Sequence, residues 1–498
     1  MLLIADILIS NSFNHYVNLD IMLSLGIPCV VAICAVHYCM QRLYAQHYKT
    51  EKELGRRGVC HAAVWAESCG GKSLCGGTAA AGGGDGYGSL SCDNFHRCDP
   101  VYRQGQLSAG GTVCRQGIIS GKKMTAETGL WYTAKRTCAE MRSSMEKTID
   151  LYVKKEGAAR EKCFSTIGEA IEAMERIAPV PEEIAAELEK GRIYPSPVYE
   201  VTPFVVHIGA GEYREKLVLS RPNVTFLGEG RDKTVLVFGD GANEIEEDGE
   251  KRGTFRTATL RIDTPDFTAR HLTFQNDAGY GHTVGQALAL YVDGDRCYFE
   301  DCAMLGSQDT LFDAPLPLDP VKPNGKGPGE HKPRIRGRHL YRNCFLQGDV
   351  DFIFGSGTAY FEECTIFSKK PGDRSPEDRD TSVYGYVTAA STHPEFPYGY
   401  VLHKCKLTSD CPKGSVYLGR PWKEWAKTVF LECELGEHIH PQGWLDWGKT
   451  HGHFYYGEYN SYGPGASPET RADFSHQLTR EEAEQYSMEK VLEGWIGE

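Results

Sequence analysis

The amino-acid sequence predicts an all-β protein, a parallel β-helix in which short strands stack coil upon coil. Five short segments resemble one another, and each alternates apolar and polar residues with a cysteine at the same place: "YFEDCAM", "LYRNCFL", "YFEECTI", "VLHKCKL" and "VFLECEL". Alternation with a period of two is typical of β-strands, and recurrence of one unit is typical of solenoids. Each end of the repeat region carries a helical pattern, as expected for elements that cap an open solenoid core.

The spacing of the repeats gives the coil length. The cysteines Cys302, Cys344, Cys364, Cys405 and Cys433 are 42, 20, 41 and 28 residues apart. Residues 314–335 are rich in proline and glycine, and without this predicted insertion of 22 residues the first gap is 20. One strand pattern per coil favours a β-helix over a leucine-rich repeat, whose L-x-x-L-x-L pattern does not recur. We interpret the five cysteines as small apolar core residues rather than as disulfides or metal ligands.

Two segments predict the terminal helices. In "STIGEAIEAMERI", residues 165–177, apolar residues recur on one helical face, and Ser165 or Thr166 is the expected N-cap. In "LTREEAEQYSMEKVLEGW", residues 478–495, Thr479 is the expected N-cap and Glu482 follows three residues later, which is a capping-box pattern.

Charge divides the chain near residue 145. Residues 1–145 have a net charge of +4 and the remainder a net charge of −17, for a total of −13. A strongly acidic chain is a poor partner for nucleic acid, so we expect none. With 498 residues and 41% hydrophobic residues, the chain is long enough for a large core. We therefore predict an N-terminal extension over 1–145 and a β-helix domain over 146–498.

The N-terminal extension has two interpretations. Ile21 to Cys39 is an apolar run of nineteen residues that no Lys or Arg precedes, which fits a signal anchor better than a cleaved secretory signal. A Gly-rich stretch follows, and the ten cysteines before residue 140 do not have zinc-site spacing, so a disulfide framework stays possible there. Alternatively, the segment is not translated, and a start at Met145 gives a cytoplasmic protein. Membrane contact is expected only under the first interpretation.

Coil spacing also brings polar residues together. Gln286 lies 22 residues before Gln308, and Asp351 lies 42 residues after Asp309, or 20 without the insertion. Residues one coil apart stack at about the inter-strand distance of 4.8 Å. Two carboxylates and two carboxamides on one face supply a nucleophile, a proton donor and oxyanion donors. The alternative is that these are solvated turn residues, and spacing alone does not decide between the two.

Residues 148–466 resemble pectin methylesterases, the pectinesterase family of carbohydrate esterases. The matching stretches include "QALALYVDGDRCYFEDCAMLGSQDTLF", "GDVDFIFGSGTAYFEECTI", "YGYVTAAST", "YLGRPWKEWAKTVFLECEL" and "PQGWLDWG". The motifs "GSQDT", "VDFIFG" and "LGRPW" occur in order over more than three hundred residues, so chance similarity is a poor explanation. The resemblance implies a right-handed parallel β-helix, in agreement with the repeat, and hydrolysis of C6 methyl esters of polygalacturonate to carboxylates and methanol.

The resemblance assigns roles to individual residues. Asp351 resembles the nucleophile that forms an acyl-enzyme, and Asp309 the general acid and base. Gln286 and Gln308 resemble the oxyanion-hole donors. Arg420 resembles the residue that pairs with the nucleophile, a contact that spacing alone does not predict.

The resemblance also implies the ligands and the surroundings of the enzyme. Phe352 and Trp422 resemble aromatic residues of the sugar groove, although packing is the alternative role for both. Methyl-esterified pectin is the expected partner, with no metal and no organic cofactor. The chain is expected to be a monomer that is secreted or on the cell surface.

The resemblance implies pKa shifts for the two aspartates, and this sequence departs from the family pattern in two segments. Beside one arginine, we expect a depressed pKa for Asp351 and a raised pKa for Asp309. Residues 178–200 and 314–335 depart from the family pattern as insertions, and the second is expected to rim the groove.

Two rival functions remain to be weighed. A β-helix that only binds polysaccharide would lack at least one of the five predicted catalytic residues, and all five are present. A pectate lyase needs a calcium-binding acidic cluster and a polygalacturonase needs several grouped aspartates, and neither pattern is evident.

Overall fold

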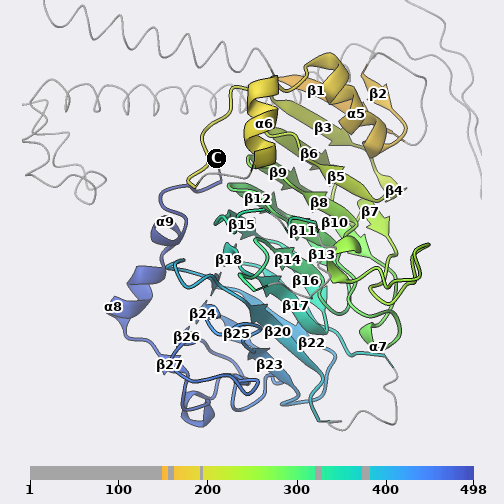
Figure 1. Cartoon of the computed structure of the whole chain (residues 1–498). Coiled ribbons are helices and arrows are strands. Elements are labelled where there is room, and N and C mark those ends of the chain that lie inside the picture. The colour runs from red at the N-terminus through yellow and green to blue at the C-terminus, as the bar shows by residue number, and fades with distance from the viewer. Residues whose placement is uncertain are drawn as a thin grey trace, which may run out of the picture. The chain divides into compact units, whose positions relative to one another are not determined.

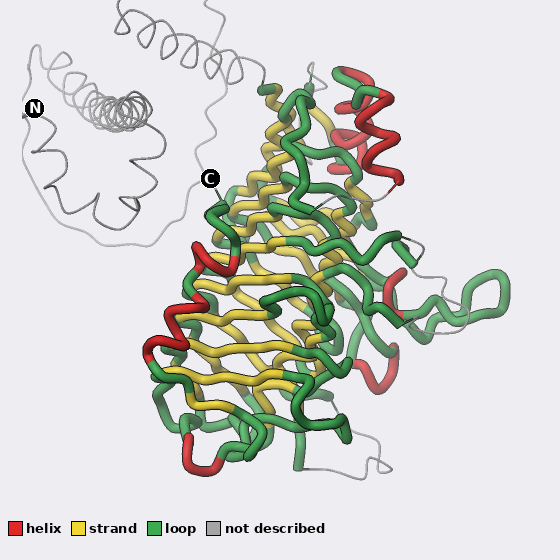
Figure 2. The backbone as a smooth tube through the Cα atoms, turned by 60° about the vertical axis from the view of Figure 1, so that its left-hand side comes forward, coloured by secondary structure: helices red, strands yellow, loops and turns green. Residues whose placement is uncertain are grey.

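The described strands form three parallel sheets, and the chain passes from one sheet to the next in each coil. The computed structural model describes residues 148–154, 162–190, 194–319, 328–330, 332–372 and 382–497. Figures 1 and 2 show the strands stacked as successive rungs. Each strand pairs with the equivalent strands of the coils before and after it. The predicted fold, a right-handed parallel β-helix, is therefore confirmed.

The sheets contain all the strands of the described residues. In spatial order the first sheet consists of β2 (Cys163–Phe164), β1 (Ile149–Val153), β3 (Phe204–Ile208), β6 (Val224–Gly228), β9 (Phe267–Arg270), β12 (Cys297–Glu300), β15 (Arg338–Arg342), β18 (Thr358–Glu362), β21 (Tyr400–His403), β24 (Lys427–Leu431), β26 (Tyr455–Tyr459) and β27 (His476–Gln477). The second consists of β25 (Glu434–Leu435), β22 (Lys406–Ser409), β19 (Thr365–Ser368), β16 (Phe345–Gly348), β13 (Ala303–Leu305), β10 (Thr273–Asn276), β7 (Thr234–Phe238) and β4 (Gly211–Arg214). The third consists of β23 (Val416–Gly419), β20 (Gly385–Ala390), β17 (Val350–Gly355), β14 (Leu311–Asp313), β11 (Leu290–Val292), β8 (Leu260–Ile262) and β5 (Leu217–Leu219).

Few helices accompany the sheets in the described part of the chain. They are α5 (Ile167–Ile177), α6 (Glu182–Lys190), α7 (Gly281–Val284), α8 (Arg480–Ala483) and α9 (Met488–Val491), with 3₁₀ turns at Thr254–Arg256, Pro468–Thr470 and Glu484–Tyr486. No described helix is long and apolar enough to cross a membrane. The apolar run 21–39 and the rest of 1–145 lie outside the described residues.

The cysteines stack inside the solenoid, as predicted. Each follows a residue in the left-handed region, such as Asp301 at φ 52° and Glu363 at φ 54°, which turns the chain from the first sheet to the second. All five are buried, and each thiol donates to backbone carbonyls, as Cys364 does to Tyr341 at 3.3 Å. Aromatic side chains stack beside them, with Tyr341 and Phe361 rings 4.6 Å apart.

Thiol labelling tests this ladder. Burial raises the pKa of the Cys364 thiol well above its usual range, which leaves little reactive thiolate. In the native protein we expect the five ladder cysteines to resist alkylation while the half-buried Cys163 reacts. Denaturation should expose all of them, and Cys364→Ala should cost roughly 1 kcal/mol of unfolding free energy. Fast native labelling of several ladder cysteines, mapped by peptide mass, would disprove inward stacking.

The two terminal segments behave differently. Helix α5 begins as predicted, with a capping box between Thr166 and Glu169, and packs Ile167 and Met174 into the end of the core. The C-terminal segment is not one helix over 478–495. The Thr479 capping box forms, but Ser487 is extended at ψ 149° and separates α8 from α9.

The C-terminal segment also lies on a different surface from the one a cap would occupy. Its apolar residues Val491 and Leu492 pack with Tyr298, Leu340 and Tyr360, which lie on strands of the first sheet. These strands alternate, because their neighbours Phe299, Tyr341 and Phe361 belong to the inner core. The segment therefore covers the outer face of the first sheet, along which α8 and α9 run in Figure 1.

Candidate active site

Backbone hydrogen bonds place the predicted site residues on three successive coils. The backbone amide of Ala287 donates to the carbonyl of Gln308 at 3.1 Å, and the backbone amide of Asp309 donates to the carbonyl of Val350 at 3.0 Å. Gln286, the pair Gln308–Asp309 and Asp351 therefore follow one another across the stack. The insertion after β14 leaves this pairing intact, because β14 pairs directly with β17. The spacing argument thus predicted the correct neighbours.

Arg420 binds Asp351 with two hydrogen bonds. Nε lies 2.8 Å from Oδ1 and Nη2 lies 2.6 Å from Oδ2. The residues are 69 positions apart in sequence, but β17, β20 and β23 are adjacent strands, and Arg420 directly follows β23. The guanidinium also lies between two rings, 3.8 Å from the centroid of Tyr386 and 3.7 Å from that of Trp447. Both rings fix the plane of the guanidinium, and Asp351 is held by a rigid partner.

Both aspartates have unusual backbone conformations. Asp309 has φ 62° and Asp351 has φ 52°, in the left-handed region that aspartate tolerates better than most residues. The register between β17 and β20 also shifts between Val350 and Ile353, which is a β-bulge. Bulges redirect side chains near functional sites. Here the bulge brings Asp351 to Arg420 while both aspartates stay mostly buried, at 7% and 8% exposure.

The pKa values of the two carboxyl groups differ from the sequence expectation in one respect. Burial, together with the charge of Asp351, raises the pKa of Asp309 well above its usual range. Burial also raises the pKa of Asp351, although Arg420 opposes this. The expected depressed pKa of Asp351 is therefore wrong, because desolvation outweighs the ion pair. The expected order holds, since Arg420 limits the rise for Asp351 and the rise for Asp309 is larger.

Phe352 does not line a groove, contrary to the sequence expectation. Its side chain is fully buried and belongs to the inner core, as does that of Ile353. The bulge makes these two consecutive residues point inward. Phe354 instead packs in a separate cluster, where its ring lies 5.7 Å from that of Trp422. The contact of Phe354 with Trp422 does not follow from strict alternation after Asp351, because alternation is interrupted at the bulge, and Phe354 is itself buried.

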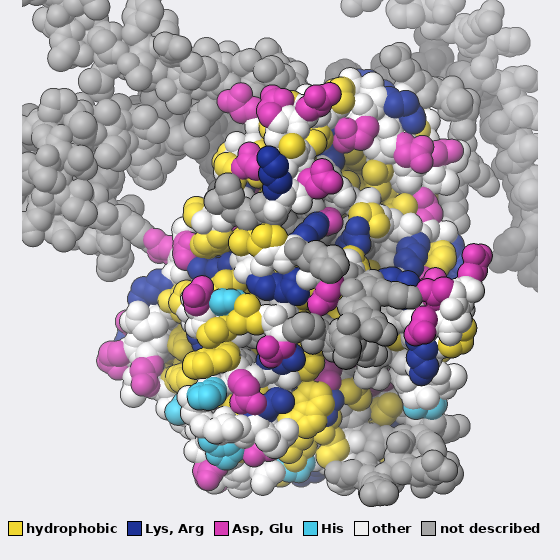
Figure 3. Space-filling model, in the orientation of Figure 1, with side chains coloured by type: hydrophobic (Ala, Val, Ile, Leu, Met, Phe, Trp, Pro, Cys, Tyr) yellow, Lys and Arg dark blue, Asp and Glu magenta, His cyan; other side chains and the backbone are white. Residues whose placement is uncertain are grey.

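An aromatic cluster extends from Trp422 over the third sheet. Trp422 is half-buried and packs against Phe255, whose ring also contacts Tyr291, Phe312 and Phe354. On the face seen in Figure 3, hydrophobic side chains lie among both basic and acidic ones.

The amide side chains of Gln286 and Gln308 are both partly exposed. Gln308 lies against Gly281 at the start of α7, where a Cβ atom would overlap its Oε1. Glycine at this position therefore leaves room for the Gln308 side chain. Within the described part of the chain no group of three or more His, Cys, Asp or Glu side chains forms a candidate metal site.

Fold and site together define a β-helical hydrolase with a carboxylate pair, and comparisons with known proteins specify the family. A model of the Pectinesterase family matches residues 192–315 and 335–495, more than half of the chain. The chain belongs to the pectinesterase family, whose members are carboxylic ester hydrolases. The match is interrupted between 315 and 335, where the sequence predicts an insertion.

Relatives and solved structures agree with the family assignment. Pectinesterase QRT1 of Arabidopsis thaliana is 31% identical over 303 residues, covering 58% of this chain and 70% of that protein. Pectinesterase/pectinesterase inhibitor PPE8B of Prunus persica is 33% identical over 321 residues, covering 60% of this chain but only 54% of that protein. Pectin methylesterase PemA from Erwinia chrysanthemi, at 30% identity, matches with a TM-score of 0.53 over 70% of this chain and 98% of its own. The carrot pectin methylesterase, at 28% identity, gives 0.52 over 70% and 93%.

Proposed function

We propose that this chain is a pectin methylesterase that hydrolyses C6 methyl esters of polygalacturonate through an aspartyl acyl-enzyme. The observation that carries the proposal is the Asp351–Arg420 pair, with hydrogen bonds of 2.8 and 2.6 Å, one coil from Asp309, whose pKa is raised further. This arrangement supports one anion and one acid in the same site.

The proposed reaction has two stages. In the first, a carboxylate oxygen of Asp351 attacks the ester carbonyl carbon, and the amide N–H groups of Gln286 and Gln308 stabilise the oxyanion. The C–O bond to methoxide then breaks, and Asp309 supplies the proton that makes methanol. In the second, ionised Asp309 takes a proton from water, which attacks the acyl group. The bond between the acyl carbon and the Asp351 oxygen then breaks, which restores the Asp351 carboxylate and leaves Asp309 protonated. The galacturonic acid that forms releases its proton to solvent and becomes a free carboxylate.

The substrate assignment draws on the groove and on a related structure. A pectin methylesterase that is 30% identical to this chain, with a TM-score of 0.53, has been solved in complex with a hexasaccharide. In this chain Trp422, two residues after Arg420, is the partly exposed aromatic side chain that suits stacking on a sugar ring, and the buried Phe354 packs against it. We propose methyl-esterified pectin or oligogalacturonate as the substrate, and Trp422 as a groove residue.

Product analysis tests the proposed function. Incubation with methyl-esterified pectin should release methanol and lower the pH, without new reducing ends and without unsaturated products. New reducing ends would indicate a hydrolase of the polymer backbone, and unsaturated ends a lyase. Binding of pectin with no product at all would favour the non-catalytic alternative and contradict the proposal.

Arg420→Lys tests how Asp351 is held. Lysine keeps a positive charge but loses the paired hydrogen bonds and the flat surface between Tyr386 and Trp447. We expect kcat to fall roughly 10²-fold, the size of effect seen when one preorganised group is removed. The matched control is Arg342→Lys, because Arg342 pairs with Glu362 at 2.7 Å on the first sheet. Equal activity of Arg420→Lys and wild type would show that charge alone suffices.

We also propose that residues 146–498 fold and act without 1–145. The described strands begin at Ile149, and the family match lies entirely within this part. A chain that starts at Met145 should be soluble, should be a monomer, and should release methanol at the rate of the full-length protein. An insoluble or inactive product beside an active full-length protein would contradict this. We propose secretion or the cell surface as the location of the enzyme, and N-terminal sequencing of the native protein would test which start is used.

A further inference from the structure

A half-buried lysine without a predicted role contacts the turn that carries Gln308 and Asp309. Lys369 directly follows β19, and its Nζ donates to the hydroxyl oxygen of Ser307 at 2.9 Å. Ser307 directly precedes Gln308 and is buried, at 4% exposure. The contact spans two coils, because β19 pairs with β16 and β16 pairs with β13, the strand before Ser307. The side chain of Lys369 is therefore directed along the stack, toward a turn of the predicted site.

Backbone hydrogen bonds hold the turns around Lys369 in one column. The backbone amide of Asp349 donates to the carbonyl of Ser307 at 3.0 Å. The backbone amide of Lys369 donates to the carbonyl of Gly348 at 2.8 Å. These turns follow strands of the second sheet, and the middle one precedes the proposed nucleophile. Burial lowers the pKa of Lys369, and the negative charges of Asp349 and Asp410 oppose this shift and favour the ammonium form.

The same lysine lies on the aromatic ring that precedes helix α7. Its Nζ is 4.7 Å from the ring centroid of Tyr280, within the range of a cation–π interaction. Tyr280 is the residue before α7, and Gly281, the first residue of α7, lies against the side chain of Gln308. Lys369 thus contacts both supports of the Gln308 side chain, which are the Ser307 turn and the start of α7.

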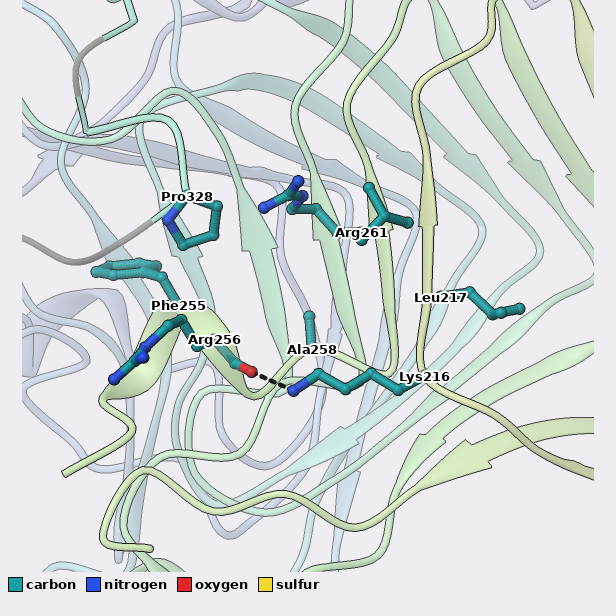
Figure 4. Close-up of a pocket in the computed structure, with 8 residues that line it drawn as sticks. Lys216, Leu217, Phe255, Arg256, Ala258, Arg261 and Pro328 are labelled. Atoms are coloured by element: carbon teal, nitrogen blue, oxygen red, sulfur yellow. Dashed lines mark hydrogen bonds between the residues drawn. The ribbon is translucent and has the colours of Figure 1, made fainter. Parts of the chain in front are cut away.

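Lys216 shows that partial burial of a lysine does not by itself connect it to the site. It lines a pocket of about 390 Å³ beside β5 and β8, together with Phe255 and Arg261 (Figure 4). There it donates to the carbonyl of Arg256 at 2.6 Å and pairs with Asp240. Neither partner belongs to the turns that precede the two proposed catalytic aspartates. The contacts of Lys369, rather than its burial, therefore distinguish it.

The amide of Gln308 depends on packing for its position. This side chain is partly exposed, and no hydrogen bond from another described residue holds its amide. An oxyanion donor is effective only when it is already oriented toward the charge that develops in the transition state. A shift of the Ser307 turn or of the start of α7 would let the amide of Gln308 rotate away from that position.

We propose that Lys369 is a positioning residue of the esterase reaction, which keeps the amide of Gln308 in the oxyanion hole by fixing the Ser307 turn and the start of α7. This inference rests on the proposed function, and in it Lys369 acts through Gln308 rather than on the sugar. The oxyanion forms only as the ester reacts, so loss of Lys369 lowers kcat and kcat/KM equally and leaves KM unchanged.

The test compares wild type with Lys369→Met, Lys369→Arg, Ser307→Ala and the double variant that combines Lys369→Met with Ser307→Ala. Initial rates of methanol release from methyl-esterified hexagalacturonate give kcat and KM. We expect Lys369→Met to lower kcat roughly tenfold at unchanged KM, less than the loss of about 10²–10³-fold that follows removal of an oxyanion donor itself. Arginine can donate to Ser307 and lie on the ring of Tyr280, so Lys369→Arg should recover most of kcat. Ser307→Ala should lower kcat less than Lys369→Met does, and the double variant should lose no more activity than Lys369→Met.

Lys427→Met is the matched control. Lys427 is also half-buried, and its Nζ donates to the carbonyl of Phe396 at 2.5 Å, but it lies on β24 of the first sheet. Lys427→Met should therefore keep the kcat of wild type. Melting temperatures identify any loss of folding, and Ser307→Ala tests the same hydrogen bond if Lys369→Met is unstable.

Three results would overturn the inference. The first is an equal kcat for wild type and Lys369→Met, and the second is a higher KM at unchanged kcat, which would place the lysine on the substrate. The third is additive losses in the double variant. Absence of methanol release from wild type would instead overturn the proposed function. Crystal structures of wild type and Lys369→Met would then decide the inference, since the Gln308 amide should keep a single orientation only in wild type.

Discussion

Asp351→Asn should reduce methanol release at least about 10⁴-fold, as expected when a nucleophile that acts as part of a unit is removed. Asparagine keeps the shape of the side chain and can still accept one hydrogen bond from Arg420, but its amide does not form an acyl-enzyme. Asparagine is preferred to alanine because the Arg420 side chain is only 14% exposed. Alanine would leave this guanidinium buried without a partner, which costs about 3–5 kcal/mol. Methanol release under single-turnover conditions measures the effect.

Substrate binding and the melting temperature of Asp351→Asn are the controls for this prediction. Asp351→Asn should bind methyl-esterified hexagalacturonate as well as wild type does, because Trp422 is unchanged. Its melting temperature should stay close to that of wild type. Turnover of Asp351→Asn near the wild-type rate would exclude Asp351 as the nucleophile, whatever the motif indicates.

The repeat in the sequence was sufficient to predict the fold and the convergence of site residues. A β-helix has one strong constraint, because equivalent positions of successive coils must stack at one spacing. Counting residues between Gln286, Gln308 and Asp351, with the insertion removed, therefore gives their spatial order. Arg420 is different, because its place depends on the paths of β20 and β23 and on irregular loop lengths, which counting does not provide.

The errors have local physical causes. Phe352 is expected in the groove because it resembles an aromatic residue of the family's sugar groove, but the bulge in β17 makes Phe352 and Ile353 both point inward and brings Phe354 to the outer cluster. No sequence pattern marks this bulge. The C-terminal segment has the period of a helix, but tertiary packing of Tyr486 against Tyr398, with centroids 5.7 Å apart, accompanies a break at Ser487.

Electrostatic effects were also harder to predict than contacts. The sequence identified a cation for Asp351, but the degree of burial decides whether the ion pair or desolvation sets the pKa. Tyr386 and Trp447 enclose Arg420 and help to exclude water, and neither had an expected role. Both residues lie in stretches that resemble the family, "YGYVTAAST" and "PQGWLDWG". The sequence therefore marked these stretches, but only the structure shows that both rings contact Arg420.

Asp309→Asn should lower kcat/KM by about 10²–10⁴-fold, the usual contribution of a positioned acid or base. The amide keeps the shape of the side chain but cannot protonate methoxide or accept a proton from water. The matched control is Asp301→Asn, which makes the same change at another left-handed position, φ 52° against φ 62° for Asp309. Asp301 lies in a turn after β12, so Asp301→Asn should leave kcat/KM unchanged. This result would exclude the change from aspartate to asparagine at a left-handed position as the cause of the loss.

The pH profile of kcat/KM distinguishes loss of proton transfer from a structural defect. In wild type, kcat/KM should rise with pH as Asp351 ionises. This acidic limb should lie at a higher pH than the usual pKa of an aspartate, because burial raises the pKa of Asp351. The value of kcat/KM should fall again as Asp309 loses its proton at higher pH, since burial and the nearby Asp351 charge raise the pKa of Asp309 further. Asp309→Asn removes the group responsible for the second limb, so its residual activity should keep the acidic limb and level off at high pH. An Asp309→Asn profile that retains the wild-type basic limb would assign that limb to another group and would reject Asp309 as the proton donor.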